Sequence, residues 1–168
     1  MPKIIENLKA RLMEEAQKQL AESGYSSLTI RSVAKACGVG VGTVYNYFPS
    51  KEALLASWML EDWHECVAVI GSVGETAQEP EQVLQCIYDQ LLLFAKRHEA
   101  LFRDEAAGAD FAGSFSRYHA LLRSQLAAPL VRFCGSEFGA EFVAESLLTW
   151  TMNGKQFDEI YGMIKKLF

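Results

Sequence analysis

The sequence predicts an all-α protein, and three observations support this fold class. Along the 168 residues, apolar side chains recur at spacings of three and four in one segment after another, which places them on one face of a helix. No segment alternates apolar and polar residues as a β-strand does, and no internal repeat is present. Glycine and proline fall between the apolar segments. We therefore expect a three-helix head at residues 1–50 and a helical body at residues 51–168.

The first expected helix covers residues 4–23 and ends at Gly24. Its apolar stripe consists of Ile5, Leu8, Leu12, Ala16 and Leu20. Because this stripe needs a partner surface, we expect the helix to brace the two short helices that follow it.

Residues 29–48 have the pattern of a helix-turn-helix. Thr29 is a suitable N-cap for the first helix, and Gly38 stands where a left-handed residue would end it. The residues expected on the buried face are Ile30, Val33, Ala34, Cys37, Val41, Val44, Tyr45 and Phe48. The far face of the second helix then carries Gly42, Thr43, Asn46 and Tyr47. A face of small and polar side chains fits the DNA major groove, although the same topology also occurs in a plain helical hairpin.

The end of this segment favours the DNA-binding alternative. Tyr45-Asn46-Tyr47-Phe48-Pro49-Ser50-Lys51 resembles the Tyr-x-Tyr-Phe-x-Ser-Lys signature of the TetR/AcrR family of bacterial transcriptional regulators. The preceding residues, 34–44, resemble that family's Ala-x-x-x-Gly-Val-Ser-x-Gly-Thr-Leu. The resemblance is strong over about residues 10–55, with Gly40 in place of the usual Ser and Cys37 in place of a common Ala. Gly is only a few tenths of a kcal/mol worse than Ser as a helix cap.

The resemblance implies a sequence-specific DNA-binding regulator, a repressor released by a small-molecule effector, acting on a palindromic operator in double-stranded DNA. Matched residue by residue, it implies DNA contacts by Thr29, Arg31, Val41, Gly42, Thr43, Tyr45, Asn46, Tyr47 and Lys51. The Arg31 guanidinium is expected to donate hydrogen bonds to the edge of a guanine base, whereas Lys51 is expected to bind a phosphate.

The charge distribution agrees with DNA binding at the amino-terminal end. Residues 1–53 hold seven Lys/Arg and five Glu, a net charge of +2, and residues 54–168 hold nine Lys/Arg and sixteen Asp/Glu, a net charge of -7. The whole chain, at -5, is poorly suited to bind nucleic acid without selectivity.

Beyond the head, the sequence predicts further helices at residues 50–70, from Pro80 onward, at 114–133 with a bend at Pro129, at 137–152 and at 155–168. The clearest loop is expected at residues 71–78, and residues 106–113 are expected to be broken because they are rich in small residues.

The last two helices are unusually apolar. Their apolar residues suit the chain's own core or an isologous four-helix homodimer interface, and the TetR/AcrR resemblance favours the homodimer. The expected interface residues are Phe142, Leu147, Trp150, Phe157, Ile160, Tyr161, Ile164 and Phe168.

The body is also rich in aromatic and histidine residues, and the resemblance implies an effector pocket among them. The candidates for ligand binding are Trp58, Trp63, His64, Tyr88, Phe115, Tyr118 and His119. For each residue taken singly, ordinary core packing is the competing interpretation. The acidic body suggests a small hydrophobic, neutral or cationic effector.

No catalytic site, metal site or cofactor is predicted. His64-Glu65 and His98-Glu99 are adjacent pairs, which diverge by about 100° on a helix, and no nucleotide or hydrolase motif is present. The four cysteines lack a metal-binding spacing. No run approaches the ~20 apolar residues of a membrane span, and no signal peptide is recognisable, so we expect a cytoplasmic protein. The alternatives are a helical protein-protein interaction module and a ligand-independent DNA-binding protein.

Overall fold

The computed structural model describes residues 7–168, apart from the side chains of residues 112–117 and 167. Two compact units are present. The first contains the chain up to Glu61 together with His98–Ala112, and the second contains Asp62–Arg97 and Gly113–Phe168. The first unit thus includes the segment expected as the head and adds two further stretches of chain to it.

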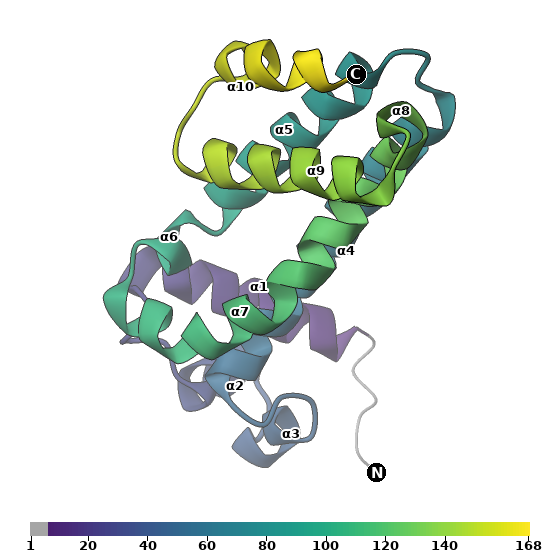
Figure 1. Ribbon diagram of the computed structural model, residues 1–168. Coiled ribbons are helices and arrows are strands. Elements are labelled where there is room, and N and C mark those ends of the chain that lie inside the picture. The colour runs from purple at the N-terminus through teal and green to yellow at the C-terminus, as the bar shows by residue number, and fades with distance from the viewer. Residues whose placement is uncertain (1–6) are drawn as a thin grey trace. The chain divides into compact units, whose positions relative to one another are not determined.

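The first unit is built around the expected three-helix head. Its elements are α1 (Leu8–Ser23), α2 (Ile30–Cys37), α3 (Val41–Tyr45), the start of α4 (Lys51–Thr76), α6 (Glu99–Phe102) and the start of α7 (Glu105–Ala127) (Figure 1). Helix α2 packs against both α1 and α3, and α6 packs against α1. The buried core includes Leu12, Leu28, Val33, Val44 and Leu54. The short helix α6 was not predicted from the sequence.

The second unit contains the remainder of α4 and α7 and the carboxyl-terminal helices. Its other elements are α5 (Pro80–Arg97), the 3-10 turn η1 (Ala128–Leu130), α8 (Val131–Cys134), α9 (Glu137–Met152), α10 (Phe157–Ile164) and the 3-10 turn η2 (Lys165–Leu167). Helix α9 packs against α5, α8 and α10. The core between these helices includes Leu84, Ile87, Leu130, Ala144 and Leu147.

The prediction of a loop at residues 71–78 is wrong over most of its length. Helix α4 continues to Thr76, and the Ala77 N–H still donates to the Val73 carbonyl at 2.8 Å. Each internal glycine weakens a helix by about 1 kcal/mol. Here a tertiary contact requires one of them, because a Cβ on Gly74 would lie 2.5 Å from Pro129 Cβ.

The predicted break at residues 106–113 is also wrong, because α7 begins at Glu105 and runs through this segment. Asp104 Oδ1 accepts the Ala107 N–H at 3.0 Å, which is an N-terminal cap. The expected helix at 114–133 is divided, since α7 ends at Ala127 and Pro129 lies in the 3-10 turn that precedes α8.

Other expected helix ends are confirmed. Gly24 follows the last residue of α1, and Gly135, with φ +67°, ends α8. Helix α9 has the predicted bounds, whereas α10 ends at Ile164 and not at the last residue. Among the helices of residues 7–168, none combines the length and the apolar character that crossing a membrane requires.

Candidate nucleic-acid interface

A reciprocal cap fixes the start of α2. The Ser32 N–H donates to Thr29 Oγ1 at 3.0 Å, and the Thr29 N–H donates to Ser32 Oγ at 3.1 Å. The Ser32 hydroxyl also lies 2.5 Å from Gln19 Oε1, which ties α2 to α1. Thr29, predicted both as a cap and as a DNA contact, thus uses its side-chain oxygen inside the protein.

Two glycines shape the turn between α2 and α3. Gly38 ends α2 in the left-handed conformation, with φ +70° and ψ 31°, where a side chain would be strained. The Val39 N–H then donates to the Ala34 carbonyl at 3.0 Å. Gly40 is the N-cap of α3, and its carbonyl accepts the Thr43 N–H at 2.9 Å. The turn therefore presents α3 at a fixed angle to α2.

Helix α3 has a buried side and an exposed side. Val44 and Phe48 are buried in the head core, whereas Tyr45 and Tyr47 are 52% and 48% exposed. The placement of Tyr45 on the buried stripe is wrong, because it lies about 100° around the helix from Val44. Its other predicted role, as a DNA contact, agrees with this exposure.

The remaining DNA-contact candidates of α2 and α3 differ in exposure. Gly42 is exposed on α3, Asn46 is exposed directly after that helix, and Arg31 is exposed in the first turn of α2. Val41 and Thr43 are half-buried. A Cβ on Gly42 would meet no atom within 4 Å, so the backbone there is open for close approach. Together these residues form an exposed face of small, amide, phenol and guanidinium groups.

Lys51 lies at the start of α4 and is held by the loop between α1 and α2. Its Nζ donates to the Tyr25 carbonyl at 3.1 Å and lies 3.8 Å from the centroid of the Tyr25 ring. An ammonium has three donors, so this contact leaves hydrogens for a phosphate. The structure thus explains how the side chain of Lys51 is oriented, a feature that the motif alone does not give.

The sequence analysis missed a polar cluster in which the buried Tyr25 meets the half-buried Glu52 and the exposed Asp110. The Tyr25 hydroxyl donates to Asp110 Oδ2 at 2.6 Å and lies 3.1 Å from Glu52 Oε1. Burial, the bond to Asp110 and the charge of Glu52 raise the pKa of Tyr25, which keeps its hydroxyl protonated as a donor. Burial opposes ionisation of Glu52, but hydrogen bonds from Ser50 and from its own backbone N–H, together with the charge of Lys51, hold the pKa of Glu52 below its ordinary value. No signal in the sequence pairs Tyr25 with Asp110, since 85 residues separate them.

Comparisons with known proteins agree with this geometry. A family model described as bacterial regulatory proteins of the tetR family matches residues 12–57. The uncharacterized HTH-type transcriptional regulator YuxN of Bacillus subtilis is 46% identical over 48 residues, 29% of this chain and 16% of YuxN. The HTH-type transcriptional repressor KstR of Rhodococcus jostii is 30% identical over 111 residues, 60% of this chain and 50% of KstR. The chain therefore spans half or less of the length of these two relatives.

A solved structure extends the likeness to the body. Thermus thermophilus FadR, a TetR-family transcriptional repressor in complex with lauroyl-CoA, has a TM-score of 0.64 at 22% identity. The likeness covers 95% of this chain and 92% of that one, and at this identity it shows the fold. These relatives are transcriptional regulators and not enzymes. Over residues 12–57 the chain is thus similar to the TetR/AcrR family of bacterial transcriptional regulators, as the sequence predicts.

The residues predicted to bind a ligand lie in several places. Trp58 belongs to the first unit, where its ring centroid lies 4.1 Å from that of His98. In the second unit Trp63 and Tyr88 are buried in the core. His64, Tyr118 and His119 are exposed, and the side chain of Phe115 lies outside the described residues. The structure thus does not gather the described candidates around one cavity, and their role in ligand binding stays a prediction.

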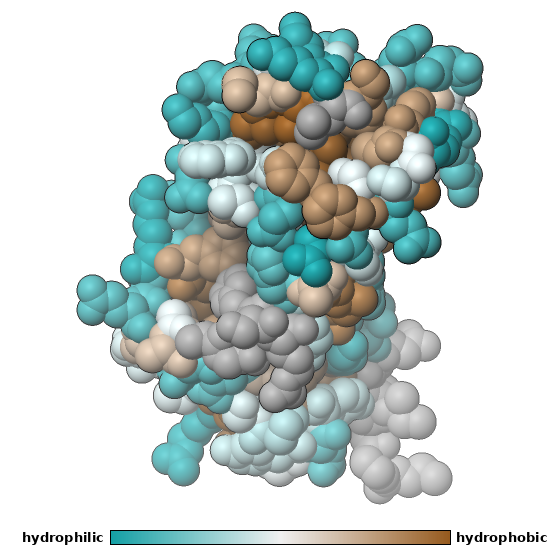
Figure 2. All heavy atoms as spheres, viewed as in Figure 1, coloured by the Kyte–Doolittle hydropathy of each residue, from teal (hydrophilic) through white to brown (hydrophobic). Residues whose placement is uncertain are grey.

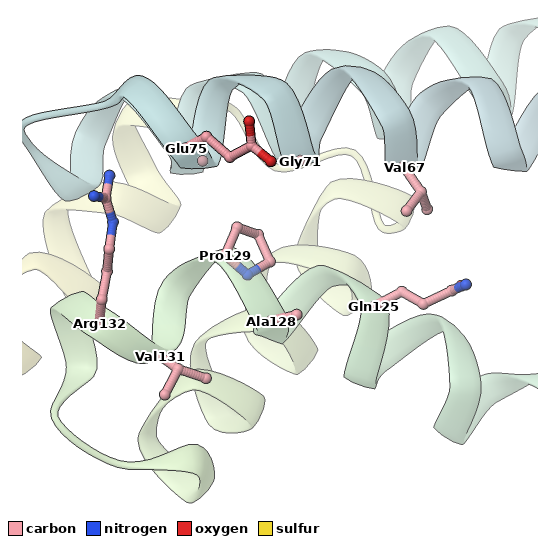
Figure 3. Close-up of a pocket in the computed structure, with 9 residues that line it drawn as sticks. Val67, Gly71, Glu75, Gln125, Ala128, Pro129, Val131 and Arg132 are labelled. Carbon is pink, nitrogen blue, oxygen red and sulfur yellow. The ribbon is translucent and has the colours of Figure 1, made fainter.

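An open hollow of about 510 Å³ lies in the second unit between α4 and the segment from α7 to α8 (Figure 3). Its lining consists of Val67, Gly71, Gly74, Glu75, Gln125, Ala128, Pro129, Val131 and Arg132. None of the six predicted ligand residues whose side chains the structure describes is among them. Two of the polar side chains are engaged within the protein, because Gln125 Oε1 accepts the Trp63 Nε1–H at 2.8 Å and Arg132 donates to the Ala77 carbonyl.

Half of the predicted dimer interface belongs to the chain's own core. Leu147, Phe157, Ile160 and Ile164 are buried in the second unit. For these four residues the burial favours the competing interpretation, packing in the chain's own core, and their place in a dimer interface stays a prediction.

The other predicted interface residues remain accessible. Phe142, Trp150 and Phe168 are exposed, and Tyr161 is half-buried. The predicted interface residues did not include the two apolar residues with larger exposed fractions, Phe138 at 77% and Met163 at 69%. The spacing of Phe138 and Phe142, i and i+4, was a readable signal that both lie on one face of α9.

Proposed function

We propose that this protein is a sequence-specific DNA-binding transcriptional regulator that resides in the cytoplasm and represses transcription as a homodimer on a palindromic operator. The observation that carries the proposal is the two-sided segment formed by α3 and the residues after it, in which Val44 and Phe48 are buried while Tyr45 and Tyr47 are exposed. Exposed aromatic residues without a structural task in the core favour a binding surface. Phenol and amide groups can donate to phosphates and base edges, and the Arg31 fork matches the two acceptors of guanine.

Selection from random-sequence duplexes tests DNA binding directly. The purified protein should enrich one palindromic sequence, and Arg31→Ala should relax the preference at one position in each half-site at a cost of about 1 to 3 kcal/mol. Lys18→Ala is the matched control, because Lys18 is an exposed cation on α1, outside the helix-turn-helix. If no sequence were enriched above the starting pool, or if both variants lost the same selectivity, the proposed DNA-reading face would be wrong.

The exposed side of α9 supports a second copy of this chain as a partner. Figure 2 shows hydrophobic side chains on the face of α9 turned toward the viewer, and Phe138, Phe142, Trp150 and Met152 are exposed on this helix. Fully burying such a side chain contributes about 1.5 to 3 kcal/mol. A twofold pair of heads also suits a palindromic operator, which explains why an isologous partner is proposed.

Light scattering at micromolar concentration tests the homodimer. Phe142→Asp should give a folded monomer, whereas Leu92→Asp, which changes an exposed apolar residue on α5, should remain a dimer. Ile164→Glu is unsuitable for this purpose, because Ile164 is buried and a buried charge would destabilise the fold. A wild-type monomer under these conditions would exclude the proposed interface.

The proposed effector is a small hydrophobic compound, neutral or cationic. Support comes from the aromatic residues of the second unit and from its acidic composition, and the coupling with DNA binding must be reciprocal. A screen monitored by tryptophan fluorescence should also include a long-chain acyl-CoA, because the Thermus thermophilus structure holds lauroyl-CoA. Binding of this anion would contradict the neutral or cationic character proposed for the effector. An effector should lower operator affinity by the same factor by which operator lowers effector affinity. A negative screen with intact operator binding would favour the alternative of a ligand-independent DNA-binding protein.

A further inference from the structure

The Tyr25 hydroxyl joins three segments of the first unit. Tyr25 lies in the loop between α1 and α2 and is 1% exposed. Its hydroxyl lies 2.6 Å from Asp110 of α7 and 3.1 Å from Glu52 of α4. A phenol has one hydrogen to donate, and the shorter distance assigns it to Asp110.

The same tyrosine holds a candidate phosphate contact through its other groups. Its backbone carbonyl accepts from Lys51 Nζ, and the ammonium lies over its ring. A displacement of Tyr25 would therefore move the lysine that the family motif places against DNA. Because an ammonium on a flexible stem loses conformational entropy on binding, holding it in place favours phosphate contact.

Asp110, which bonds the Tyr25 hydroxyl, belongs to α7, a helix that continues beyond the first unit. Ala107 and Phe111 of the same helix belong to the head core, and the Phe111 ring meets the Tyr25 ring edge-on with centroids 6.4 Å apart. After Ala112 the helix passes into the second unit. The Asp110 bond thus connects the head to a helix that both units share.

We infer that Tyr25 is a positioning residue for DNA binding, whose bond to Asp110 of α7 fixes the loop between α1 and α2 and, through it, the Lys51 ammonium. The inference rests on the proposed DNA-binding function and names a device by which α7 acts on the head.

Tyr25→Phe tests the inference, because it removes the hydroxyl and keeps the ring under Lys51. Binding to the duplex enriched by the wild-type protein should weaken by about tenfold, in the range of a lost hydrogen bond to a charged group. Ser57→Ala is the control, since it also removes a hydroxyl from the first unit, one that donates to the Ala53 carbonyl within α4 at 2.8 Å. It should bind DNA as the wild type does, and circular dichroism should show that both variants are folded at the assay temperature.

Variants of Asp110 separate positioning from general stability. Asp110→Asn keeps an oxygen acceptor and should bind DNA within about threefold of the wild type, whereas Asp110→Ala should match Tyr25→Phe. The double variant Tyr25→Phe/Asp110→Ala should bind DNA no more weakly than either single variant, because both substitutions remove the same hydrogen bond. In the absence of DNA, amide hydrogen exchange in the loop between α1 and α2 should be faster in Tyr25→Phe than in the wild type, and it should be unchanged in Ser57→Ala.

The outcomes distinguish the two proposals. If the wild-type protein enriches no duplex, the proposed function fails and this inference fails with it. If the wild type binds and folded Tyr25→Phe binds equally well, only the inference is overturned. Equal weakening of DNA binding in Ser57→Ala would also overturn the inference, since the effect would then not be specific to the Tyr25–Asp110 hydrogen bond.

Discussion

Gly74 allows α4 to lie directly against Pro129, and replacing it by alanine should reveal that contact. An ideal Cβ on Gly74 would lie 2.5 Å from Pro129 Cβ and 3.5 Å from Pro129 Cα. Carbon atoms prefer separations of about 3.5 to 4.0 Å, so the helix or the 3-10 turn η1 must move by about 1 Å. The proline ring is fixed to its backbone and cannot rotate away.

Two opposing effects set the magnitude. Gly→Ala in a helix interior contributes up to about 1 kcal/mol of stability, while overpacking a core contact costs about 1 to 3 kcal/mol. Gly71→Ala is the internal control on the same helix, because a Cβ there would meet no atom within 4 Å. It should raise the free energy of unfolding, and Gly74→Ala should be about 1 to 3 kcal/mol less stable than Gly71→Ala.

Denaturant unfolding of the two variants, followed by circular dichroism, measures this difference. The same difference should appear in the melting temperature as about 2 to 4 °C per kcal/mol. If Gly74→Ala were as stable as Gly71→Ala, the close approach of α4 to Pro129 would not be what requires glycine, and the reasoning would be refuted.

Three further results are expected. Thr29→Ala should destabilise the head by about 1 kcal/mol in thermal unfolding, because it removes the acceptor for the Ser32 N–H, and an unchanged melting temperature would contradict the cap. Glu52→Gln should be less stable than the wild type at pH 7. The folded pKa of Glu52 lies below its ordinary value of 4.5, so its contribution is present above 4.5 and is lost as the pH falls through the folded pKa. The denaturant midpoints of the wild type and of Glu52→Gln should therefore converge as the pH falls. A difference between the two midpoints that stayed constant with pH would contradict the role of the Glu52 charge. Lys51→Ala should reduce the salt dependence of operator affinity by about one unit of slope, and an unchanged slope would show that Lys51 touches no phosphate.

Local patterns in the sequence determined much of the head. The apolar spacing, Thr29 as the cap of α2 and Gly38 as its left-handed end can be read from short stretches of chain, and the structure confirms them. These features depend on backbone geometry within a few residues, which is why they are predictable. The motif that indicates the resemblance to the TetR/AcrR family is equally local, and the matched residues 12–57 contain it.

Tertiary contacts decided the features that the sequence analysis missed. Gly71 and Gly74 look like loop residues, but both lie within α4, and the close approach of Pro129 leaves no room for a side chain at Gly74. Ile164 and Met163 are adjacent apolar residues of α10, and only the placement of α5 and α9 determines that the first is buried and the second is exposed. An apolar stripe predicts that one face of a helix will be buried. It does not predict which surface will bury that face.

The clearest division between local and tertiary information is at Tyr25. The sequence by itself places Lys51 at the end of a DNA-binding motif, because that motif is a continuous run of residues. Only the folded chain brings Asp110 to the Tyr25 hydroxyl and the Tyr25 ring beneath Lys51. Contacts between residues 85 positions apart depend on how whole helices pack, and helix packing is set by many side chains at once and not by any local pattern.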